Sequence, residues 1–128
     1  MNPGTRMLAR TCGVVAIGGV AGALARYGLG VLIPTRPDAF PWTTFAINVL
    51  GCLALGALVP LVGTHAVLRP LLGTGVLGGF TTFSTYMVDI QRLVRHGEPE
   101  LAAAYLAGTA ILALSAAYLG GFLMRRLR

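Results

Sequence analysis

Charged side chains are scarce in this sequence, and lysine is missing altogether. Only 11% of the 128 residues are charged, against about 25% in an ordinary soluble domain. Hydrophobic residues make up 55% of the chain. So little polar surface cannot coat a globule in water, which excludes a soluble domain of this size. The sequence also has no low-complexity tract and no block of like charges, which excludes a long disordered segment.

Several classes of function lack the residues that they need. The ten basic residues, all arginine, outnumber the four acidic ones. They stand singly between apolar runs or at the chain ends, without the basic stripe that binds nucleic acid. No nucleophile–base pair and no metal-ligand spacing occurs, so nothing favours an enzyme. The two cysteines, Cys12 and Cys52, fall within apolar runs and are best explained as small packing residues.

Four apolar segments are each long enough to cross a bilayer, which takes about 20 residues. They cover residues 12–33, 42–62, 66–88 and 101–124. The connections between them are too short to hold a domain. Residues 1–128 are therefore predicted to form one all-α, four-span domain in the cell (inner) membrane. A cleaved signal peptide is rejected, because the first apolar run resumes after Arg26 and three more spans follow.

Arginine counts leave the orientation of these spans open. With four spans, one side holds both termini and six arginines, and the other side holds four. An excess of positive residues marks the cytoplasmic side, so this weak excess fits two outcomes. Either the termini lie inside the cell, or the chain inserts both ways and forms an antiparallel two-fold dimer. The six arginines are Arg6, Arg10, Arg69, Arg125, Arg126 and Arg128.

The third span carries a polar interruption that follows a glycine pair, Gly78 and Gly79. Such pairs kink helices, and backbone freed at membrane depth has to be satisfied by protein, an ion or water. Freed carbonyls are good ligands for a hard cation, and hydroxyls can donate to an anion. The alternative is a kinked helix whose hydroxyls bond back to their own carbonyls. The hydroxyl residues are Thr81, Thr82, Ser84, Thr85 and Tyr86.

Polar residues on the neighbouring spans form two stripes. Thr44 and Asn48 share one helical face at i, i+4, and Tyr105 and Thr109 repeat this spacing on the last span. An amide in mid-membrane is unfavourable without a partner. Taken singly, both stripes are also explained by interhelical hydrogen bonds or local packing. On the first span, Arg26 is either a functional charge or a side chain that reaches to the membrane surface.

Together these segments resemble the Fluc (CrcB) family of fluoride channels over essentially the whole chain. The resemblance rests on GGVAGALARY at residues 18–27, on TFAINVLG at 44–51 and on GGFTTFST at 78–85. Three motifs in register within a four-span chain make a specific match. The resemblance implies a channel that passively exports fluoride and so lowers cytoplasmic fluoride. It also implies an antiparallel, dual-topology homodimer with two pores along the subunit interface.

The same resemblance implies roles for individual residues. Backbone carbonyls of Gly78 and Thr81 would hold a structural Na⁺ at the dimer centre, and Arg26 would lie near the pore vestibule. Phe83 matches one pore phenylalanine, whereas Tyr86 replaces the second. The other expected pore residues are Thr44, Asn48, Ser84, Thr85, Tyr105 and Thr109.

The physical chemistry of fluoride suits this set of residues. Fluoride is small and strongly hydrated, so a pore has to replace its water with several hydrogen-bond donors. Asn48 offers two amide donors, and each hydroxyl offers one. Aromatic rings have positive edges that can face an anion.

The alternative from another class is a proton-coupled exporter of the small multidrug-resistance type, which also has four short spans. Such an exporter needs a carboxylate deep in its first span, and this chain has none there. Asp89, at the end of the third span, does not meet this need. A purely structural subunit would leave the polar stripes unexplained. The expected partners are therefore fluoride, a second copy of the chain and membrane lipid, and not nucleic acid.

Overall fold

The computed structural model describes residues 2–127, and this part of the chain is helical, with no strand. Its long helices are α1 (Pro3–Leu32), α2 (Trp42–Val62) and α5 (Pro99–Arg126). Each is long and apolar enough to cross a membrane. This confirms the predicted class, an all-helical, multi-pass membrane protein. The bounds of α2 are those of the predicted second span, whereas α1 begins well before residue 12.

The predicted third span, residues 66–88, is built from three pieces. The first is η1 (Arg69–Leu77), a π-helix, whose turns are wider than those of an α-helix. The second is the short α3 (Gly78–Phe80), after which Thr81 turns to extended backbone with φ −72° and ψ 156°. The third is α4 (Ser84–Arg95). The interruption therefore lies at residues 81–83, directly after the glycine pair and the phenylalanine that follows it.

α4 is longer than its sequence suggests. The polarity of the chain from Asp89 onward predicts a connection, but the helix continues to Arg95. An ion pair between Asp89 and Arg92 explains the difference, because Oδ1 lies 3.0 Å from Nη2 at the helical spacing i, i+3. With its charge paired, Asp89 is accommodated within the packed helix.

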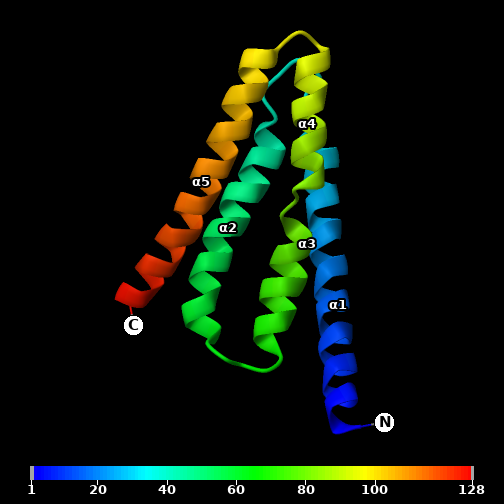
Figure 1. Ribbon diagram of the computed structural model, residues 1–128, viewed down its shortest axis with the longest axis vertical. Coiled ribbons are helices and arrows are strands. Elements are labelled where there is room, and N and C mark those ends of the chain that lie inside the picture. Colours follow the sequence, from blue (N-terminus) through cyan, green and yellow to red (C-terminus); the bar gives the residue numbers. More distant parts are fainter. Residues whose placement is uncertain (1, 128) are drawn as a thin grey trace.

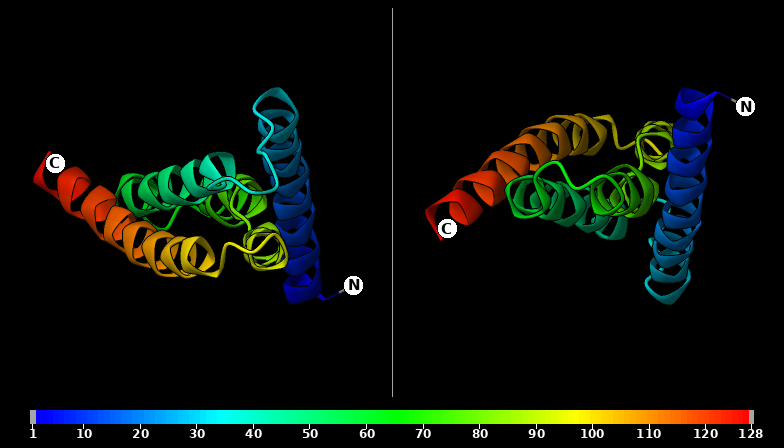
Figure 2. Two further views of the ribbon diagram at one scale, coloured as in Figure 1. Left: turned by 90° about the horizontal axis from the view of Figure 1, so that it is seen from above. Right: turned by 90° about the horizontal axis from the view of Figure 1, so that it is seen from below.

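Both chain ends and the turn after α2 lie at one end of the molecule (Figure 1). α2 packs along α5, while η1 and α3 pack against α1. Seen from above and below, α1 and α5 lie at opposite edges, with α2 and the broken segment between them (Figure 2). The interruption thus has helices on two sides.

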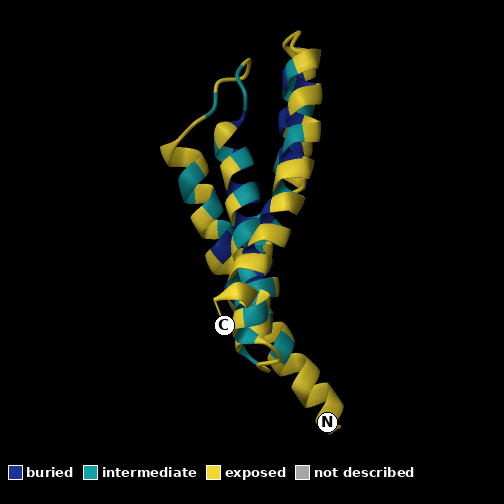
Figure 3. Ribbon diagram, turned by 90° about the vertical axis from the view of Figure 1, so that its left-hand side faces the viewer, coloured by how far each residue is buried: buried dark blue, intermediate teal, exposed yellow. Residues whose placement is uncertain are grey.

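The best-buried part of the molecule lies between α4 and α5. Its centre is formed by Tyr86, Leu93, Ala102 and Tyr105. Outer helix faces are largely exposed (Figure 3), and they include large apolar side chains such as Leu114, which is 74% exposed. Such a surface is typical of contact with lipid tails or with another chain.

Two glycines let the helices approach closely. A Cβ on Gly22 of α1 would overlap the backbone carbonyl of Val76 in η1. A Cβ on Gly56 of α2 would overlap the backbone carbonyl of Ala117 in α5. Small residues at such points allow helices in a membrane to make close van der Waals contact.

We expect Gly22→Ala to lower the free energy of unfolding by about 1–3 kcal/mol, because its methyl group forces α1 away from η1. The measurement is thermal unfolding in detergent, followed by circular dichroism. Gly13→Ala on the same helix is the control, since a Cβ at Gly13 meets nothing within 4 Å. Equal midpoints for the two variants would contradict this close packing.

Candidate functional site

Asn48 of α2 holds the interruption in place. Its Nδ2 donates to the carbonyl oxygen of Thr82 at 2.9 Å, and its Oδ1 accepts from the backbone N–H of Thr82 at 2.8 Å. Both residues are 8% exposed, so these bonds are shielded from water. They replace helical hydrogen bonds that the break removes, as irregular backbone at membrane depth requires. The second amide hydrogen of Asn48 makes no hydrogen bond within residues 2–127.

Thr82 also orders the start of α4 through its hydroxyl. The Thr82 Oγ1 accepts from the backbone N–H of Thr85 at 3.1 Å, in the manner of a helix cap. It donates to the Thr85 Oγ1 at 3.1 Å, and the Ser84 Oγ lies 3.3 Å away. The Thr85 hydroxyl therefore acts as an acceptor here and keeps its own hydrogen available for a further acceptor.

At the break, the backbone carbonyls of Gly78, Phe80 and Thr81 accept no hydrogen bond from any part of the described chain. The backbone N–H and the hydroxyl of Thr81 both bond to Leu77, at 2.9 and 3.0 Å. The N–H of Thr82 is taken by Asn48. Unpaired carbonyl oxygens are suitable ligands for a hard cation, so Gly78 and Thr81, two of these three, fit the Na⁺ role that the resemblance implies.

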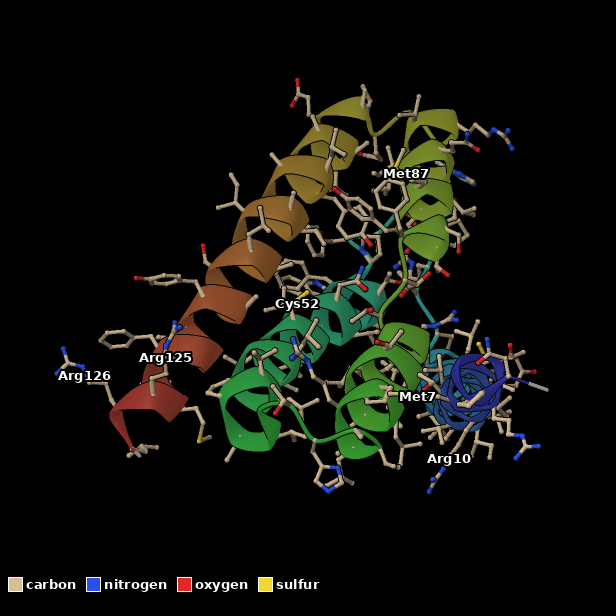
Figure 4. All side chains as sticks on the ribbon, turned by 60° about the horizontal axis from the view of Figure 1, so that its bottom comes forward. Met7, Arg10, Cys52, Met87, Arg125 and Arg126 are labelled. Atoms are coloured by element: carbon tan, nitrogen blue, oxygen red, sulfur yellow. The ribbon has the colours of Figure 1, made fainter. Side chains whose placement is uncertain are left out.

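A groove of about 410 Å³ runs beside the break, between α2 and α5. We call it the inner groove. Thr109 is only 3% exposed, and its hydroxyl has no hydrogen-bond partner within residues 2–127. Buried polar atoms are rarely left unpaired, so this hydroxyl points to a ligand or water in the groove. Cys52 of α2, labelled in Figure 4, also lines it. Other lining residues are Asn48, Gly78, Thr81, Thr82, Phe83, Tyr86, Ala110, Ala113 and Leu114.

Phe83 and Tyr86 contribute two neighbouring aromatic rings to the inner groove. Their centroids are 5.9 Å apart, but Phe83 is 73% exposed and Tyr86 only 5%. Tyr86 packs edge-on against Tyr105 at 5.1 Å, and its hydroxyl donates to the carbonyl oxygen of Leu106 on α5. Because that hydroxyl is committed to α5, Tyr86 presents its ring to the groove much as a phenylalanine would.

A second cavity, of about 400 Å³, lies near the C-terminal end of α1 and the N-terminal end of α2. We call it the mouth cavity. Thr82 lines both it and the inner groove, so the Asn48–Thr82 pair stands where the two meet. Arg26 lines the mouth cavity from α1, and its Nε donates to the carbonyl oxygen of Gly79 at 3.2 Å. This bond holds the guanidinium beside the break.

Two charged residues of the mouth cavity are absent from the predicted site, Asp89 and Arg92. Asp89 is 4% exposed, and its Oδ2 accepts from the Tyr105 hydroxyl at 3.4 Å. The predicted third span ends at residue 88, which places both residues in a connection and not in the site. The signal that could have found them is helical spacing, since Thr85 and Asp89 are separated by one turn and Arg92 follows at i+3.

Most of the predicted pore residues come together around these two cavities. The exceptions are Tyr105 and Ser84, which line neither one. Tyr105, on α5, is fully buried in the core between α4 and α5, and Ser84 is exposed on the surface. The remaining predicted pore residues that line a cavity are Thr44, Asn48, Phe83, Thr85, Tyr86 and Thr109.

Known proteins match this chain over most of its length. Residues 13–121 match the family described as CrcB-like protein, Camphor Resistance (CrcB). Fluoride-specific ion channel FluC 2 of Streptomyces avermitilis is 54% identical over 100 residues, which cover 75% of this chain and 63% of that protein. Fluoride-specific ion channel FluC 1 of Streptomyces coelicolor is 45% identical over 127 residues, 96% of this chain and 82% of that protein.

A further relative is fluoride-specific ion channel FluC 2 of Nocardia farcinica, 48% identical over 110 residues, which cover 83% of this chain and 79% of that protein. The match spans less than two thirds of the Streptomyces avermitilis protein, but more than three quarters of the other two. These matches confirm the resemblance noted in the three sequence motifs. The chain belongs to the CrcB-like protein family.

Proposed function

We propose that this chain forms a fluoride channel through which fluoride leaves the cell passively across the inner membrane. The observation that carries the proposal is the inner groove. There the free amide hydrogen of Asn48 and the unpaired hydroxyl of Thr109 lie beside the rings of Phe83 and Tyr86. Donors and ring edges of this kind replace the hydration shell of a small anion. No carboxylate of the described chain lines the groove.

The relatives support transport and not catalysis, since those compared above are all named as fluoride-specific ion channels. Their names do not favour the proton-coupled exporter. Such an exporter also needs a carboxylate that binds and releases protons during transport. Asp89 is a poor candidate for that role, because Arg92 pairs with its charge and Tyr105 donates to it.

A continuous pathway requires the broken segment to cross the membrane as a fourth span. Residues 69–95 run from the end that holds the termini to the opposite end of the molecule (Figure 1). η1, α3 and α4 are each too short to span alone, but together they cover this length. The Asn48–Thr82 bonds pair both backbone groups of Thr82, which favours placing the break at membrane depth.

A second copy of the chain, inserted in the opposite orientation, would complete the channel as a homodimer. Phe83 is largely exposed on the single chain, and the inner groove is open to one side. A two-fold partner would cover both features. It would also bring together the unpaired carbonyls of Gly78 and Thr81 from two chains, where they would hold a structural Na⁺. The weak arginine excess is compatible with insertion in both orientations.

Reconstitution into liposomes tests the proposal directly. Vesicles loaded with fluoride or with chloride are diluted into a low-halide buffer, and efflux is followed with an ion-selective electrode. We expect rapid fluoride efflux that needs no proton gradient, with little chloride efflux. Absence of fluoride efflux from the purified chain, or drug export coupled to protons, would overturn the channel assignment.

Tyr86→Phe is expected to leave fluoride efflux unchanged within about twofold, because the ring remains and only the bond to Leu106 is lost. The free energy of unfolding should fall by about 0.5–1.5 kcal/mol, the usual contribution of one hydrogen bond. Thermal unfolding and the efflux assay measure the two effects. A large loss of efflux in this variant would show that the hydroxyl itself belongs to the pathway.

A further inference from the structure

The mouth cavity carries charges of both signs. Arg26 and Arg92 contribute two positive charges to its lining, and Asp89 contributes one negative charge. The lining is therefore net positive, which attracts an anion. An anion that enters nevertheless meets a carboxylate on its way toward the Asn48–Thr82 pair.

Asp89 lies deep in this lining, with its side chain only 6% exposed. A charge that is removed from water keeps most of its field, because there is little solvent to screen it. Without a positive partner, this carboxylate would repel an anion that enters the cavity, and its own burial would be unfavourable. The hydroxyl of Tyr105 donates to Asp89 Oδ2 at 3.4 Å, but it adds no positive charge.

Arg92 supplies that charge from the same helix. Its Nη2 lies 3.0 Å from Asp89 Oδ1, yet neither Nη2 nor Nε makes a hydrogen bond of good geometry within residues 2–127, and both atoms are buried. The guanidinium thus balances the carboxylate through Nη2. Arg26 differs, because its Nε bonds to a backbone carbonyl, that of Gly79, and not to a carboxylate.

We infer that Arg92 is the counter-ion that makes the mouth cavity passable to an anion. It cancels the charge of Asp89, and the Thr85 hydroxyl in the same lining offers a donor to fluoride on its way to the inner groove. Arg92 is a positioning and specificity residue that acts through electrostatics. This inference rests on the proposed channel function and deepens it, because it names how the mouth admits an anion past a carboxylate.

The test compares Arg92→Gln, Arg92→Lys, Asp89→Asn and the double variant D89N/R92Q in the liposome efflux assay. Arg92→Gln should slow fluoride efflux by about tenfold or more, because it leaves the Asp89 carboxylate uncompensated. Arg92→Lys keeps a positive charge beside Asp89 and should retain efflux within about threefold of the unmodified chain. Asp89→Asn alone should not slow efflux. The double variant should recover to within about threefold, because the uncompensated carboxylate is then gone and neutral amides stand in place of the ion pair.

Arg95→Gln is the matched control, since Arg95 lies on the same helix, is exposed and does not line the mouth cavity. Unchanged efflux in Arg92→Gln would overturn the inference. So would a double variant as slow as Arg92→Gln, because that result assigns Arg92 a purely structural role. If Arg92→Gln does not fold, the double variant decides alone: near-normal efflux supports the inference and slow efflux overturns it. Failure of the unmodified chain to pass fluoride would instead refute the proposed function.

Discussion

Asn48→Ala is expected to reduce fluoride efflux by at least about 100-fold, because one side chain serves both the fold and the pathway. Its amide bonds twice to the backbone of Thr82 and presents its remaining hydrogen to the inner groove. Alanine removes the donor and also leaves the Thr82 N–H and carbonyl unpaired in a buried place. The efflux assay measures the first loss, and thermal unfolding in detergent measures the second, which should be about 1–3 kcal/mol.

Ser115→Ala is the control for this variant. Ser115 lies on α5, is exposed and lines neither the inner groove nor the mouth cavity, so loss of its hydroxyl should change neither property. Size-exclusion chromatography of both proteins shows whether they assemble alike. If Asn48→Ala passes fluoride as fast as Ser115→Ala, the pathway does not run through the inner groove.

Phe83→Ile is expected to reduce efflux by about tenfold or more without lowering stability. Isoleucine is apolar like phenylalanine, but it has no ring and therefore no positive edge to turn toward an anion. Phe83 is 73% exposed on the single chain, so the change removes little packing within it. Efflux, thermal unfolding and the size of the assembled protein should be measured on one preparation.

Tyr118→Ile provides a control of matched exposure, because Tyr118 is also 73% exposed but lies on α5 outside the inner groove. Normal efflux in this control, with slow efflux in Phe83→Ile, would assign the effect to the aromatic ring beside the break. If the two variants behave alike, Phe83 has no special part in conduction. If Phe83→Ile also fails to form the oligomer, the main role of Phe83 is in the subunit interface and not in conduction.

Asn48→Ala and Phe83→Ile should differ in their effects on stability and on efflux. Asn48 connects α2 to the break, so its loss should disturb stability and efflux together. Phe83 lies at the break, but its side chain does not stabilise it, so its loss should disturb efflux alone. This contrast distinguishes residues that stabilise the interruption from residues that take part only in conduction.

Much of the architecture could be predicted from the sequence, because its determinants are local. Apolar length located α1, α2 and α5, and the glycine pair with its hydroxyl residues located the break near Thr81. The i, i+4 spacing correctly placed Thr44 with Asn48, and Tyr105 with Thr109, on buried faces. Other features could not be predicted in this way. The sequence pattern did not show that residues 69–77 form a π-helix packed closely on the glycines of α1, or that α4 continues past Asp89, whose charge is paired with Arg92.

By itself, the sequence determined that this protein is a helical membrane protein with a polar break flanked by polar stripes, since composition and periodicity act over a few turns of one helix. Only the tertiary structure decided which polar groups are already paired and which remain available to an ion. That choice depends on partners far apart in the chain, such as Asn48 with Thr82 and Arg26 with Gly79. Because each of these bonds removes donors or acceptors from the lining, the pattern of uncommitted groups appears only once the helices have packed.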